Sequence, residues 1–85
     1  MQSSSYLQLR SEPIALLCPE PLTDPLTLLR DHPFIRYDRN DLGGRLAAVW
    51  IKSQRLVVRE WLELHHLEAI AVMASAGLGV SIVPD

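Results

Sequence analysis

The last segment of the chain, residues 67–85, limits the fold more than any other part of the sequence. Between Leu67 and Ala74 the apolar residues recur three and four positions apart, which predicts an amphipathic helix. Gly77 stands where a helix commonly ends with a positive φ, and a β-branched run that stops at Pro84 follows it. A helix that returns through a glycine into a buried strand is half of an α/β unit, so we expect an α/β domain.

Strand and helix patterns alternate along the rest of the chain. The continuous apolar run at residues 14–18 is typical of a strand that is covered on both faces. Asp24 and Pro25 form a helix start, with aspartate as the cap and proline at the first helical position. Further elements are expected at residues 34–37 (strand), 46–53 (helix) and 56–64 (strand, clearest at 59–64), after an extended segment at residues 6–9. The predicted fold class is therefore α/β, with a mainly parallel sheet flanked by helices in the order β-α-β-α-β-α-β.

Length and composition fit one small domain. The chain has 85 residues and a formal net charge of −2 at pH 7. This slightly negative net charge argues against direct contact with nucleic acid, because the neutralisation of phosphates requires an excess of basic residues. The single cysteine, Cys18, lies in an apolar run and is predicted to be a buried, unreactive thiol. We expect residues 1–5 to be a flexible lead-in and residues 6–85 to form a single α/β subdomain.

The hydropathy pattern contains no membrane signal. No apolar run approaches the roughly 20 residues that a helix needs to span a bilayer. The first residues lack the basic region and apolar core of a secretory signal. We therefore expect a cytoplasmic protein without membrane contact.

The first candidate binding segment joins the strand at residues 34–37 to the helix that follows. Ligands of open α/β sheets bind beyond the carboxyl ends of the strands, next to helix N-termini, where backbone N–H groups favour anions. Two glycines let a ligand approach the backbone closely, and arginines supply charge-assisted hydrogen bonds. The alternative is a solvated loop whose glycines serve packing only. The candidate contacts are Arg39, Asn40, Leu42, Gly43, Gly44 and Arg45.

The second candidate segment precedes the last helix and contains His65 and His66. Adjacent residues of a helix point apart, and the spacing of known zinc motifs is missing, so a ligand-contacting or structural role is favoured over a metal site. The carboxylate pairs Asp38–Asp41 and Glu60–Glu63 are of the kind that a solvated surface carries. From these patterns we assign no catalytic residue, no metal ligand and no cofactor.

Two segments taken together resemble a known family. The stretches "PFIRYDR…GGR" and "LEL..LEAIA.M...GLGVSIVPD" look like the effector-binding region of LysR-type transcriptional regulators, and the similarity extends over residues 9–85. The resemblance implies the second subdomain of that region, which is one lobe of a periplasmic-binding-protein-like fold. It also implies a non-catalytic sensor of a small, often anionic effector, with contacts at residues 38–44 and 65–66. DNA would be contacted only through a helix-turn-helix domain that this chain lacks.

One departure from the family pattern concerns the last helix. Such regulators commonly carry a short polar pair before it, whereas this chain has His65–His66, which caps a helix poorly. Two other functions stay open: a lobe of a solute-binding protein, and a small enzyme or metal-binding domain that uses His65, His66 and Glu68. Because a subdomain exposes surface that its partner covers, we expect self-association to an oligomer.

Overall fold

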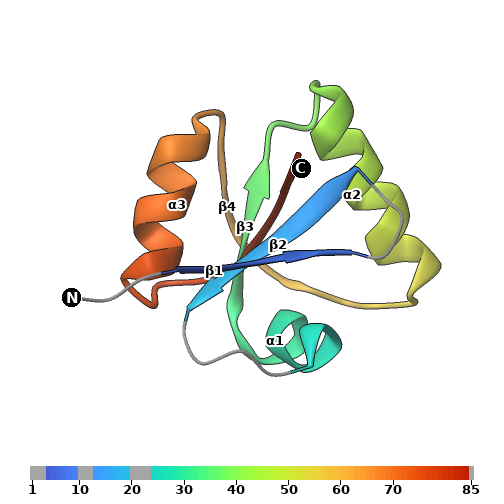
Figure 1. Cartoon of the computed structure of the whole chain (residues 1–85). Helices are drawn as coiled ribbons and strands as arrows, with labels where there is room; N and C mark the ends of the chain where they lie inside the picture. Colours follow the sequence, from blue (N-terminus) through green and yellow to red (C-terminus); the bar gives the residue numbers. More distant parts are fainter. Residues whose placement is uncertain (1–3, 10–12, 20–23, 85) are drawn as a thin grey trace.

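The computed structural model describes residues 4–9, 13–19 and 24–84 of the chain. Within these ranges, three helices cover five strands (Figure 1). In chain order the elements are β1 (Ser4–Gln8), β2 (Ile14–Pro19), α1 (Pro25–Asp31), β3 (Pro33–Tyr37), α2 (Leu42–Ser53), β4 (Arg59–Leu64), α3 (Leu67–Ser75) and β5 (Ser81–Pro84). The predicted α/β class is confirmed, and each predicted helix and strand is present.

The strands form an antiparallel sheet of β1, β2 and β5 and a parallel sheet of β3 and β4, rather than one mainly parallel sheet. β2 pairs antiparallel with both β1 and β5, whereas β3 pairs in parallel with β4. A parallel bridge between Phe34 and Val80 links the two sheets, and the Ile35 N–H donates to the Val80 carbonyl over 2.8 Å. The mainly parallel arrangement is therefore not confirmed. The apolar run of β2 indicates that both faces of the strand are covered, but it does not indicate the direction of the strand. The five residues between β1 and β2 are too few for the crossover helix that a parallel pair requires.

Two apolar cores lie on opposite faces of the strands. The side chains of β2 alternate between them, because successive residues of a strand point to opposite faces. Figure 1 shows α2 and α3 on opposite sides of the strands. The core beneath α1 and α2 contains Leu9, Ile14, Leu16, Cys18, Leu28, Leu29, Phe34, Ala47, Ile51, Val80 and Ile82. The core beneath α3 contains Leu17, Ile35, Ile70, Ala74 and Val83.

Local signals at the helix ends act as the sequence predicts. The Asp24 carboxylate caps α1 by accepting from the Thr27 N–H over 3.1 Å, and Pro25 is the first residue of that helix. Gly77 follows α3 with a φ of 78°, a conformation that glycine adopts without strain. The helix expected at residues 46–53 begins earlier, at Leu42, because Asp41 provides its N-cap.

Two further expectations concern the beginning of the chain and its membrane propensity. Residues 1–3 of the predicted lead-in lie outside the described residues, whereas Ser4 and Ser5 belong to β1. Within the described ranges, no helix has the length and hydropathy that a membrane span requires. Cys18 is fully buried, as predicted.

Candidate functional site

The two candidate segments lie side by side at the carboxyl ends of β3 and β4. The parallel register pairs Tyr37 with Leu64, so Asp38 and His65, the next residue on each strand, are neighbours. Residues 38–41 lead from β3 into α2, and residues 65–66 lead from β4 into α3. The strand register thus brings together two segments that are far apart in sequence.

Two aspartates shape the first segment. The Asp38 Oδ1 accepts from the Asn40 N–H over 2.9 Å, and the Asp41 N–H donates to the Asp38 carbonyl over 3.2 Å. The Asp41 Oδ2 accepts from the Gly43 N–H over 2.9 Å and caps α2. A carboxylate of the chain therefore already lies at the N-terminus of this helix, where favourable interaction with the helix dipole stabilises it.

Packing explains both glycines of the first segment. A Cβ at Gly44 would lie 1.8 Å from the Asp38 carbonyl oxygen, and a Cβ at Gly43 would lie 2.4 Å from the Pro84 Cγ. Both glycines are buried. They allow the first turn of α2 to contact the ends of β3 and β5. Direct contact between a ligand and these glycines stays a prediction.

Arg39 is held by two carboxylates of the neighbouring strand. Its backbone N–H donates to the Glu63 Oε2 over 3.1 Å, and its Nε donates to the Glu63 Oε1 over 3.0 Å. Its guanidinium also pairs with Glu60, which accepts from the Arg36 Nε over 2.8 Å. Arg39 therefore fastens the first segment to β4, and an anionic ligand would compete with Glu60 and Glu63 for it.

A bulge in β4 brings these carboxylates to one face. Phe34 pairs with Glu60 but Ile35 pairs with Leu62, so Trp61 is an extra residue in the ladder. Without the bulge, Glu60 and Glu63 would point to opposite faces, because they are three positions apart. The bulge was not predicted, and the two glutamates are a linked network rather than the solvated pair we expected.

The network keeps its carboxyl groups ionised. Hydrogen bonding from Arg36 lowers the pKa of Glu60, and the backbone N–H of Arg39 lowers the pKa of Glu63. The Asn40 N–H likewise lowers the pKa of Asp38, with a smaller contribution from His65. The site therefore presents fixed negative charge, balanced by Arg36 and Arg39.

The second segment borders an open pocket. Its volume is about 580 Å³, and it is lined by Tyr37, His65, His66, Leu67, Glu68 and Ala69. The His65 Nδ1 lies 3.3 Å from the Asp38 Oδ2. His66 is the N-cap of α3 but makes no side-chain capping hydrogen bond, as its residue type predicts. The first N–H groups of this helix therefore lack the side-chain partner that Asp41 gives to α2.

Apart from the two glycines, the predicted site residues fall into three groups. Arg39 joins the carboxylate network, and His65 and His66 line the pocket at α3. Asn40, Leu42 and Arg45 are exposed. In the described ranges, no side-chain hydrogen bond or ion pair connects them to the histidines. Sequence reasoning missed the participation of Glu60, Glu63 and Tyr37, although the alternation of Glu63 with His65 was a readable signal.

A second pocket lies at the other end of β4. Its volume is about 360 Å³, and it is lined by Pro33, Arg59, Glu60, Trp61 and Leu78. Trp61 and Leu78 are each about half exposed, at 50% and 49%. This pocket contains none of the predicted site residues.

Comparison with known proteins agrees with the resemblance found in the sequence. The model of one protein family, described as the LysR substrate binding domain, matches residues 2–85. No curated protein and no solved structure matched the chain.

Proposed function

This chain belongs to the family of LysR substrate binding domains, and on that premise we propose that it senses a small anionic metabolite for a transcriptional regulator. It carries out no reaction on that molecule. Binding would close a cleft to which this subdomain contributes one wall, and the closure would shift the regulator between two arrangements. Contact with DNA through a helix-turn-helix domain and self-association stay predictions.

The pocket at the beginning of α3 carries the proposal. Backbone N–H groups of a helix's first turn have no partner within the helix, and the helix dipole favours an anion near them. At α3 these groups border the pocket, and His66 gives them no side-chain hydrogen bond. A carboxylate of the effector would take the place that a capping side chain occupies in other helices. His65 and His66 would contact it from the pocket wall.

The first segment would supply the second set of contacts. Asn40 and Arg45 are exposed and able to turn towards a ligand, and Leu42 offers an apolar contact that is 63% exposed. Arg39 would contribute by releasing one of its carboxylate partners. Gly43 and Gly44 would act by holding the first turn of α2 in place.

The test is a titration of the isotope-labelled chain by NMR with benzoate, and with benzamide as the uncharged control of the same shape. We expect benzoate to shift the amide signals of Leu67, Glu68 and Ala69, and benzamide to shift them much less. The substitution H66A should weaken benzoate binding. E68Q should strengthen it, because the Glu68 carboxylate lines the same pocket and repels an anion.

Two results would contradict the proposal. Equal shifts with benzoate and benzamide would remove the preference for an anion. Shifts confined to the pocket that contains Trp61 would place binding at the opposite end of β4. The substitution H32A, in the cap of α1, is the matched control and should leave binding unchanged.

A further inference from the structure

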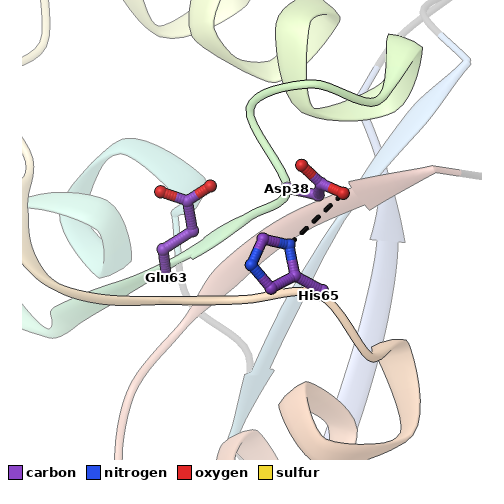
Figure 2. Close-up of side chains that lie close together, drawn as sticks. All are labelled: Asp38, Glu63 and His65. Carbon is purple, nitrogen blue, oxygen red and sulfur yellow. Dashed lines mark ion pairs between the residues drawn. The ribbon is translucent and has the colours of Figure 1, made fainter.

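Three potential metal ligands meet where β3 and β4 end. They are the Asp38 and Glu63 carboxylates and the His65 imidazole, and one donor atom from each lies within 4.8 Å of the other two. Figure 2 shows the His65 ring between the two carboxylates, with its Nδ1 directed at Asp38. The sequence pattern suggested a metal-binding alternative that uses His65, His66 and Glu68. The grouping of His65 with Asp38 and Glu63 is seen only in the folded chain.

The backbone fixes this grouping. Glu63 and His65 are two positions apart on an extended segment, so their side chains point to the same face. Asp38 follows Tyr37, which pairs with Leu64, and therefore lies beside His65. Asp38 is further held by the Asn40 N–H. The three donors thus come from the ends of two adjacent parallel strands and the residues that directly follow them.

We propose that Asp38, Glu63 and His65 bind a divalent transition-metal ion, with Zn²⁺ as the best fit. Zn²⁺ accepts imidazole nitrogen and carboxylate oxygen at about 2.0–2.2 Å, so two ligands of a tetrahedral ion lie roughly 3.4 Å apart. The His65 Nδ1 and Asp38 Oδ2 are 3.3 Å apart, which already meets this requirement. The donor atoms all lie within 4.8 Å of one another, so the Glu63 carboxylate must move inward to complete the set.

The charge of the site supports a cation. Asp38 and Glu63 supply two carboxylate groups, and Zn²⁺ accepts carboxylate oxygen as a ligand. His65 is 62% exposed, so the ion reaches it from solvent. Three protein ligands leave a fourth position for water.

Arg39 is the competitor for this site. Its Nε lies 3.0 Å from the Glu63 Oε1, so its guanidinium already neutralises one of the ligands. A metal ion must displace that side-chain bond, which lowers the affinity of the natural chain. Removal of Arg39 should therefore strengthen metal binding, whereas removal of a ligand should weaken it. R39Q also removes a positive charge and so favours any cation, whereas H65Q leaves every carboxylate in place. Loss of binding in H65Q but not in H66Q therefore separates a built site from general attraction of cations to an acidic surface.

The test is calorimetric titration of the metal-free, untagged chain with Zn²⁺, in the absence of any effector. We expect one ion per chain. H65Q and E63Q should each weaken binding at least about tenfold, because even partners outside the ligand set contribute 10–100-fold. R39Q should strengthen binding several-fold. H66Q and H32Q should leave it within about twofold, and circular dichroism checks that each variant is folded.

Cobalt supplies an independent readout. Co²⁺ bound through one nitrogen and two oxygens should show the strong visible absorption of a four-coordinate ion, and H65Q should abolish it. The proposal is overturned if millimolar Zn²⁺ does not bind, if H65Q binds normally, or if H66Q loses binding as H65Q does. None of these measurements involves an effector. Failure of the metal proposal would therefore leave the proposed sensing function untouched, and failure of the sensing function would leave the metal proposal untouched.

Discussion

Substitution of Gly44 by alanine tests whether the first turn of α2 is packed directly on the end of β3. The added Cβ would lie 1.8 Å from the Asp38 carbonyl oxygen and 2.9 Å from the Tyr37 carbonyl oxygen. Both are backbone atoms, so no side-chain rotation relieves the contact. The helix would have to retreat by more than about 1 Å before the contact became an ordinary one.

Two effects of opposite sign decide how much G44A changes the free energy of unfolding. Alanine is more favourable than glycine inside a helix by about 1 kcal/mol, which alone would stabilise G44A. Overpacking costs about 1–3 kcal/mol even where side chains adjust, and a backbone clash belongs at or above the upper end. We therefore expect G44A to lower the free energy of unfolding by about 2 kcal/mol.

Gly43 supplies the matched control. The Cβ of G43A would meet Pro84 through the side-chain atoms Cγ and Cδ, at 2.4 and 3.1 Å. Replacement of Pro84 by alanine removes both atoms and leaves only its Cβ, at 3.2 Å, so G43A should be clearly less destabilising in a P84A background than in the natural chain. G44A should not be rescued by P84A, because its clash is with the backbone of β3.

Urea unfolding followed by the fluorescence of Trp50 and Trp61 measures these effects. With a denaturant slope of about 1 kcal/mol/M, a loss of 2 kcal/mol moves the midpoint by about 2 M. A G44A variant as stable as the natural chain, or more stable, would refute the packing of α2 on β3. Rescue of G44A by P84A would refute the separate causes assigned to the two glycines.

Three further predictions use the same unfolding assay. S81A should lower stability by about 1 kcal/mol because the buried Ser81 hydroxyl donates to the Ile35 carbonyl over 2.6 Å, whereas S75A, at an exposed hydroxyl of α3, should change it little. H66S should raise stability by about 0.5–1 kcal/mol by giving α3 a capping hydroxyl, and an unchanged midpoint would show that the cap is not limiting. The pKa of Glu60 is lowered in the folded chain, so its contribution to stability is complete above the ordinary pKa of 4.5. That contribution is lost as the pH falls through the lowered pKa. E60Q should therefore lose less stability in acid than the natural chain.

Local chemistry explains which parts of the fold were predictable. Asp24 and Pro25 define the beginning of α1, and Gly77 marks the end of α3, because capping and positive φ are properties of a few neighbouring residues. The strand expected over residues 56–64 is observed at Arg59–Leu64, the part where its pattern is clearest. The antiparallel pairing of β2 was not predicted, because strand direction depends on which strands become neighbours.

The candidate site was predictable in position but not in its contacts. Arg39 and His65 were recognised because both follow a strand and precede a helix, which is where α/β sheets bind ligands. The sequence could not show that Glu63 holds Arg39 and lies near His65, since this depends on the register of β4 against β3. Nor could it show the bulge at Trp61, which needs pairing information from another strand.

The contacts that sequence reasoning missed make the two candidate segments one electrostatic unit. Arg39 ties the first segment to Glu63 on β4, and Asp38 ties the same segment to His65 at the end of β4. A ligand or ion that draws on either segment must therefore change the partners of the other. Because groups that share partners do not contribute independently, R39Q and H65Q should be non-additive in any property of the site, whereas R45Q, on an exposed side chain, should combine additively with H65Q. Additive behaviour of R39Q with H65Q would mean that the two segments act separately despite their proximity.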